Sequence, residues 1–137
     1  MSLTPHQITL ISQSFYKVEP ISEKITEIFY KTLFAYEPTV KSLFKGDMQQ
    51  QGRKLMVMLH TVVNSLNRLD NLVPVLQDLA KRHVDYGVKK THYTPVGNAL
   101  IHTLQIGLGD DFTPEVKAAW IAILDIIADT MKAEMDS

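Results

Sequence analysis

The sequence Leu72-Val-Pro-Val-Leu-Gln-Asp-Leu-Ala-Lys-Arg-His-Val-Asp-Tyr-Gly-Val88 places a histidine on the apolar face of a predicted helix. Four apolar side chains have the i, i+3, i+4, i+7 spacing of one helix face: Leu72, Val75, Leu76 and Leu79. His83 follows at i+11 on that face, and Gly87 offers a helix end or a turn with positive φ. The imidazole is therefore expected to point inward, either as a core residue bonded to a carbonyl or as a metal ligand.

The length and charge of the chain narrow the class of protein. A chain of 137 residues fits one domain with a substantial core, and 45% apolar with 21% charged residues is an ordinary globular composition. A formal charge of −1 provides no electrostatic footprint for nucleic acid or an anionic membrane, so neither partner is expected. No apolar run is long enough to cross a bilayer, and the N-terminus has no secretory pattern, which predicts a cytoplasmic protein.

The chain contains no cysteine, which excludes disulfides, thiolate nucleophiles, iron–sulfur clusters and the covalent attachment of a c-type haem. A Gly-rich phosphate loop, a G-x-S-x-G motif and an H-E-x-x-H motif are also missing from the sequence. The enzyme classes that are most easily recognised from sequence therefore find no support.

Helix start signals recur along the chain, and no segment has the alternation of a strand. Thr4-Pro-His-Gln7 reads as a capping box, and Thr113-Pro-Glu115 combines an N-cap with a proline at the first helical position. Between these signals, helical spacing predicts further helices after Pro20, from about Met48 to Leu69, around His83, and from His92 or Pro95. The sequence thus predicts an all-α fold with six or seven helices.

Two consecutive predicted helices each carry one polar residue on an apolar face, Gln51 on the first and His83 on the second. In an all-helical domain this pattern favours a pocket between two helices, with one strong metal ligand facing hydrogen-bonding groups. Haem suits such a pocket, because its apolar body would cover the apolar faces and its iron would take the histidine.

Six separated segments resemble those of bacterial single-domain haemoglobins and of the globin domain of flavohaemoglobins. They are Phe29-Tyr-Lys-Thr-Leu-Phe34, Glu37-Pro-Thr-Val-Lys-Ser-Leu-Phe44, Gln51-Gly-Arg-Lys-Leu55, Arg82-His-Val-Asp-Tyr-Gly-Val88, His92-Tyr-Thr-Pro-Val-Gly97, and Phe112-Thr-Pro-Glu-Val116 with Ala119-Trp120. The resemblance covers almost the whole chain in the right order. It implies a globin fold around non-covalently bound haem b, with residues 1–137 forming a single globin domain without a reductase domain.

The resemblance also implies roles for individual residues. His83 corresponds to the proximal histidine, whose Nε2 binds the iron while the other nitrogen donates to a neighbouring acceptor such as the Leu79 carbonyl. On the distal side, Tyr30 and Gln51 match a pair of donors to the bound gas, and each donor should contribute about 1–3 kcal/mol. Four further positions complete the expected cofactor site: Phe44 on the porphyrin face, Leu55 beside the ligand, and Tyr93 and Val96 from the fifth segment. Arg82 is either a partner of the haem propionates or a solvated surface charge.

These roles predict reversible, high-affinity binding of dioxygen by a monomer or weak homodimer, with nitric oxide and carbon monoxide as further ligands. Two alternatives remain: a nitric oxide dioxygenase that uses a separate reductase, and a gas sensor. Flavohaemoglobins place a tyrosine and a glutamate near the proximal histidine. Tyr93 matches the tyrosine, whereas a gap-free count puts the glutamate position on Met135, next to Glu134.

Overall fold

The computed structural model describes residues 3–135, and this part of the chain forms six α-helices and no strand. The α-helices are α1 (Pro5–Val18), α2 (Ser22–Tyr36), α3 (Met48–Asn64), α4 (Leu69–Asp85), α5 (Tyr93–Leu108) and α6 (Pro114–Met135). Short 3-10 helices connect them: η1 (Glu19–Ile21), η2 (Pro38–Leu43), η3 (Lys90–His92) and η4 (Gly109–Asp111). The prediction of an all-α fold is confirmed.

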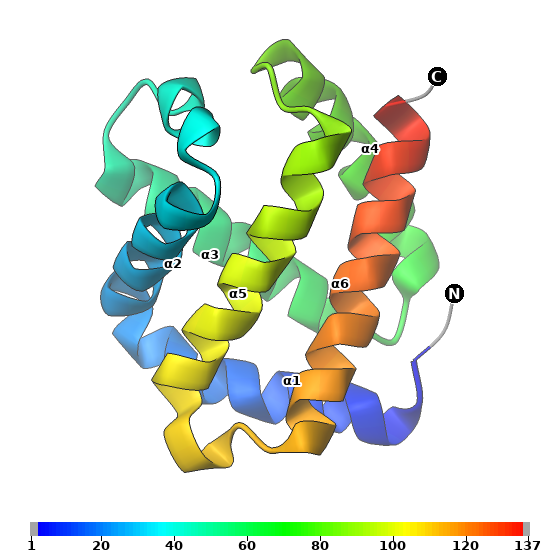
Figure 1. Ribbon diagram of the computed structural model, residues 1–137. Helices are drawn as coiled ribbons and strands as arrows, with labels where there is room; N and C mark the ends of the chain where they lie inside the picture. Colours follow the sequence, from blue (N-terminus) through cyan, green and yellow to red (C-terminus); the bar gives the residue numbers. More distant parts are fainter. Residues whose placement is uncertain (1–2, 136–137) are drawn as a thin grey trace.

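The helices pack in a way that separates α3 from α4. Helices α5 and α6 run antiparallel, α1 crosses one end of the molecule, α2 packs on α5 and α3, and α4 packs on α6 (Figure 1). Although α3 and α4 are consecutive, each is held mainly by other helices rather than by its neighbour in sequence. Packing against other helices therefore fixes where α3 and α4 place their side chains.

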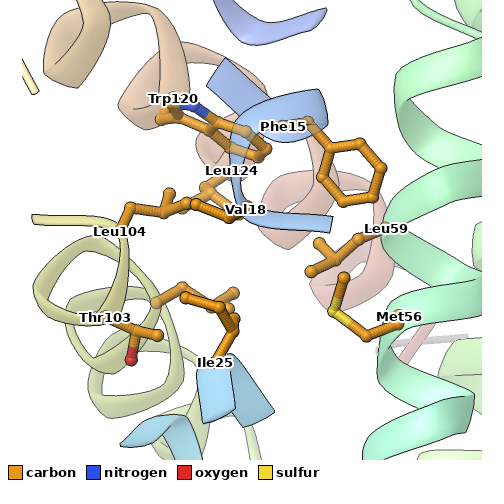
Figure 2. A pocket seen from close by; sticks show the side chains of 10 residues that line it. Phe15, Val18, Ile25, Met56, Leu59, Thr103, Leu104, Trp120 and Leu124 are labelled. Atoms are coloured by element: carbon orange, nitrogen blue, oxygen red, sulfur yellow. The ribbon is translucent and has the colours of Figure 1, made fainter. Parts of the chain in front are cut away.

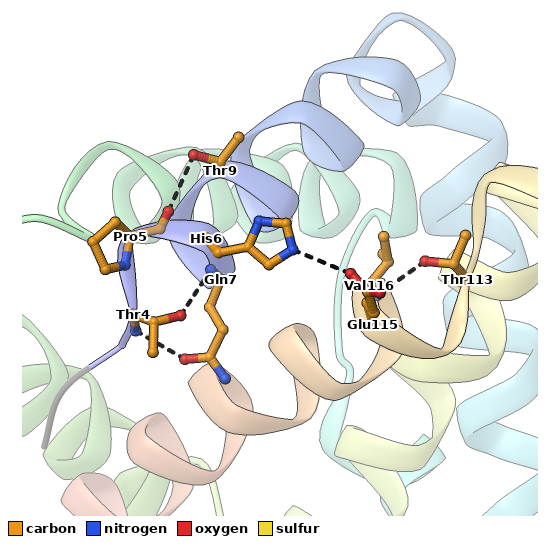
Figure 3. A network of polar contacts seen from close by, with 8 residues as sticks. All are labelled: Thr4, Pro5, His6, Gln7, Thr9, Thr113, Glu115 and Val116. Carbon is orange, nitrogen blue, oxygen red and sulfur yellow. Dashed lines mark hydrogen bonds and ion pairs between the residues drawn. The ribbon is translucent and has the colours of Figure 1, made fainter.

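The two clearest helix starts have the predicted caps. The Thr4 hydroxyl accepts the Gln7 amide at 3.1 Å, while the Gln7 side chain accepts the Thr4 amide at 2.9 Å. At α6 the Thr113 hydroxyl accepts the Val116 amide at 3.2 Å. His6 joins these two helix starts by contacting a Glu115 carboxylate oxygen at 3.1 Å (Figure 3).

The main core surrounds Trp120, which is 2% exposed and donates its indole N–H to the Ser14 hydroxyl at 2.8 Å. Leu72 and Leu76 of α4 are equally buried in this core. Burial of these two leucines fixes the rotation of α4 about its axis. This rotation sets the direction of the His83 side chain, two to three turns further along the helix.

Three local features differ from the sequence interpretation. The predicted helix from about Met48 to Leu69 ends at Asn64, and α4 already begins at Leu69. Val75, expected on the buried face of α4, is 37% exposed. The reason is that the buried face follows Leu72, Leu76 and Ala80, so Val75 lies at its edge.

Candidate functional site

A second hydrophobic cluster lies apart from the Trp120 core and gathers four of the eight predicted site residues. Its buried members are Phe29, Tyr30, Leu33, Val40 and Ala99, and its half-buried members are Phe34, Leu43, Phe44, Leu55, Val96 and Leu100. Four residues predicted from sequence share this cluster: Tyr30 of α2, Leu55 of α3, Val96 of α5, and Phe44, which directly follows η2. Sequence reasoning missed Leu43, Phe34 and Ala99, because apolar residues on a helix face carry no signal that separates a site from ordinary core.

Tyr30 and Gln51 are brought together from α2 and α3. The Tyr30 hydroxyl donates a long hydrogen bond of 3.4 Å to the backbone carbonyl of Gln51. Burial raises the pKa of Tyr30 to about 12, and the Gln51 side chain acts in the opposite direction. Near pH 7 the phenol is therefore protonated and can serve as a hydrogen-bond donor inside an aromatic group that also contains Phe29, Phe34 and Phe44.

His83 lies near the C-terminal end of α4 and is half-buried. Burial lowers its pKa, the Leu79 carbonyl acts in the opposite direction, and the positive charge of Arg82 lowers the pKa further. Its Nδ1 atom is buried and forms no hydrogen bond of normal geometry with the residues that the structure describes. The imidazole is therefore neutral near pH 7, which is the state that binds a metal.

Gly87 ends the α4 segment as the sequence predicted. It has a φ of 93°, a conformation that favours glycine, and the Val88 amide turns back to the His83 carbonyl at 2.9 Å. A β-carbon on Gly87 would lie 3.3 Å from Leu43 Cδ2 of η2. This contact joins the end of α4 to the cluster that contains Tyr30 and Phe44.

Tyr93, the other predicted residue on the side of His83, begins α5 and packs against the main core. Its hydroxyl oxygen is buried without a hydrogen-bond partner among residues 3–135, and burial raises its pKa. Glu134 does not supply that partner, because its carboxylate pairs with Lys81 at 3.4 Å. The Lys132 ammonium lies 5.9 Å from the centre of the Tyr93 ring.

Arg82 and His92, near the ends of α4 and α5, both have partners close by in the sequence. Arg82 is exposed and pairs with Asp78 one turn earlier at 3.2 Å, so its role toward a haem propionate stays a prediction. His92, which the sequence offered as one start of a predicted helix, is 9% exposed, and its Nδ1 accepts the Lys89 amide at 3.0 Å. It therefore acts as a local cap at the start of α5 rather than as part of the cluster.

A small apolar cavity of about 20 Å³ lies in the main core, between side chains of α1, α2, α3, α5 and α6 (Figure 2). Phe15, Met56 and Trp120 are among its lining residues. The Thr103 hydroxyl at its wall is already bonded to the Ala99 carbonyl at 2.7 Å. The cavity includes none of the predicted site residues.

Residues 27–131 match the family model described as Globin. The chain belongs to the globin family. The family assignment agrees with the all-α architecture, and it confirms the resemblance noted in the sequence.

Several relatives of this globin are flavohemoproteins. It is 27% identical to the flavohemoprotein of Vibrio cholerae over 129 residues, which are 92% of this chain and 33% of the relative. It is 30% identical to a flavohemoprotein of Xylella fastidiosa over 134 residues, covering 96% of this chain and 34% of the relative. The chain thus spans about a third of the length of the curated relatives it matches.

Membership of the globin family implies haem and supports haem-based binding of diatomic gases. The residues present fit that cofactor, since a neutral histidine lies at the end of α4 and the half-buried apolar side chains of the second cluster approach that end at Gly87 and Leu43. No helix within residues 3–135 is long and apolar enough to span a membrane.

Proposed function

We propose that this globin binds haem b non-covalently through His83 Nε2 and binds dioxygen reversibly with high affinity. One observation carries the proposal: the protonated Tyr30 hydroxyl and Gln51 meet within the cluster that also holds Phe44, Leu55 and Val96. When bound, the haem iron supplies the bond to the gas. All other contributions come from side chains of this chain.

Tyr30 and Gln51 act as hydrogen-bond donors to the gas. The phenol O–H and the amide N–H favour a diatomic ligand whose atoms carry partial negative charge. Each donor contributes about 1–3 kcal/mol, or one to two powers of ten in affinity. The long bond of 3.4 Å from Tyr30 to the Gln51 carbonyl is weak, so the hydroxyl can exchange it for the gas at low cost.

The apolar residues around this pair exclude water. Phe44, Leu55 and Val96 are half-buried in one cluster, and their uncovered surface would be covered by the flat porphyrin. A dry pocket strengthens the two hydrogen bonds, since competing water is absent.

Absorption spectroscopy of the purified protein tests the proposal. We expect an intense Soret band, a five-coordinate spectrum after reduction, and a stable change on adding oxygen that is reversed when oxygen is removed. A six-coordinate iron in the reduced, gas-free protein would overturn the assignment of an open distal site. A chain that shows no Soret band after haem addition would overturn the assignment of haem as the cofactor.

A second function is favoured by the flavohemoprotein relatives, whose name denotes both flavin and haem. The same pocket would combine nitric oxide with dioxygen and one electron from a separate reductase to give nitrate. The counted glutamate position falls on Met135, and the neighbouring Glu134 is paired with Lys81, which ranks this activity below oxygen binding. Nitric oxide consumption that stops after one turnover, despite a flavin reductase and nicotinamide, would exclude it.

A further inference from the structure

Basic side chains are concentrated in two segments that flank the candidate site. Residues 41–54 and 81–90 contain eight of the fourteen Lys and Arg residues but only two of the fifteen Asp and Glu residues. The rest of the chain contains six basic and thirteen acidic residues. The formal charge of −1 therefore conceals a charge of +6 in these two segments and −7 elsewhere.

The two segments lie together in the structure. Leu43 of the first segment lies 3.3 Å from where a β-carbon on Gly87 of the second would be, and Phe44 and Leu55 belong to the same hydrophobic cluster as Leu43. In Figure 1, η2 and the loop after α4 lie at the end of the molecule opposite α1. Both basic segments therefore reach the same end of the molecule, where Glu134 pairs with Lys81 and Asp78 pairs with Arg82.

Five exposed basic residues belong to these two segments, and we call them the basic rim. They are Lys41, Lys45, Arg53, Lys54 and Lys89. None of the five forms an ion pair with a residue between positions 3 and 135. Lys45 directly follows Phe44 and Lys54 directly precedes Leu55, so two of these residues adjoin site residues in the sequence.

Structural partners account for only part of the positive charge. Lys81 pairs with Glu134 and Arg82 pairs with Asp78, and both therefore stand outside the basic rim. The two carboxylates of haem would neutralise two charges at most. The five charges of the basic rim still exceed the two haem carboxylates, and unpaired like charges on one surface cost stability unless a partner uses them.

We propose that the basic rim docks an acidic flavoprotein that delivers electrons to the haem, an inference that rests on the proposed function. In the transfer, the reduced flavin loses one electron and the ferric iron gains it, so no covalent bond is formed or broken. Opposite charges speed the encounter and orient the flavin toward the pocket. The acidic remainder of the chain disfavours extended polyanions, which would reach beyond the basic rim.

Binding of the haem-loaded globin to oxidised flavodoxin, an acidic flavoprotein used as the probe, tests this proposal by surface plasmon resonance. We expect the dissociation constant to rise at least about tenfold when NaCl is raised from about 20 mM to about 200 mM. The double variant Lys45→Glu/Lys54→Glu should weaken binding by at least about tenfold at low salt. The matched control is Lys24→Glu/Lys117→Glu, which makes the same charge change at exposed positions near the α1 end and should alter binding less than about twofold.

Three outcomes would overturn the proposal: no association at low salt, association that is insensitive to salt, or equal losses in the two double variants. Binding of the protein to anionic phosphatidylglycerol vesicles, with loss only in the Lys45/Lys54 variant, would instead assign the basic rim to a membrane surface. Reduction by dithionite separates this proposal from the proposed function. A variant that still binds oxygen after dithionite but no longer binds flavodoxin has lost the docking surface alone.

Discussion

The Tyr30 hydroxyl lies 3.4 Å from the backbone carbonyl of Gln51, although 21 residues separate them in sequence. The approach of α2 to α3 that makes this possible occurs at Gly52, where a β-carbon would lie 2.7 Å from the Thr26 hydroxyl oxygen. Placement of the two polar residues in one pocket therefore depends on a neighbouring glycine that has no chemistry of its own.

Replacing Tyr30 with phenylalanine should speed oxygen release about 10–100-fold, since one donor worth about 1–3 kcal/mol is lost. Stopped-flow displacement of oxygen by carbon monoxide measures the rate. Tyr16→Phe is the matched control, because Tyr16 is 49% exposed and bonds to Asn64 away from the cluster. An unchanged release rate in Tyr30→Phe would remove this residue from the distal site.

Alkaline titration of the haem-free chain should reveal the burial of Tyr30. Because the folded-state pKa of Tyr30 is about 12 while the ordinary value is 10.0, the folded state keeps its proton longer than the unfolded state. This contribution is fully present below pH 10 and is lost as the pH rises to about 12, amounting to at most about 3 kcal/mol.

Urea unfolding at several alkaline pH values measures this loss. Tyr30→Phe should lose stability less steeply above pH 10 than the unmodified chain. Some slope should remain, because burial also raises the pKa of Tyr93. Equal slopes in both proteins would mean that Tyr30 is not buried as the structure describes.

Replacing His83 with alanine should accelerate haem loss by more than about tenfold, since the iron would lose its expected ligand from the chain. Transfer of haem to an excess of an unrelated apoglobin measures this rate. Free imidazole should partly restore the ligand field in the variant spectrum. The control His60→Ala removes an exposed histidine that pairs with Glu19 and should retain haem normally; retention by His83→Ala as well would refute the proximal assignment.

Local sequence signals predicted the helix starts and the polar site residues better than they predicted contacts between residues far apart in the sequence. Caps at Thr4 and Thr113 depend on neighbours within three residues, so the sequence alone was sufficient to place them. The break between α3 and α4 was missed, because no proline or glycine marks Ser65–Arg68. The Lys81–Glu134 ion pair is a long-range contact that no local spacing encodes.

Replacing Gly52 with alanine should destabilise the chain by about 1–3 kcal/mol, because the new methyl group would lie 2.9 Å from the Thr26 β-carbon and would force α2 and α3 apart. Urea unfolding measures the cost, which should shrink in the Thr26→Ala background, where the hydroxyl oxygen at 2.7 Å is gone. Gly97→Ala is the control, since that helical glycine has no atom within 4 Å of a built β-carbon and alanine should stabilise α5 by up to about 1 kcal/mol. Equal effects at the two glycines would show that no close contact exists at Gly52. If oxygen release also quickens in Gly52→Ala, the spacing of α2 and α3 sets the hydrogen bonds of Tyr30 and Gln51 as well as stability.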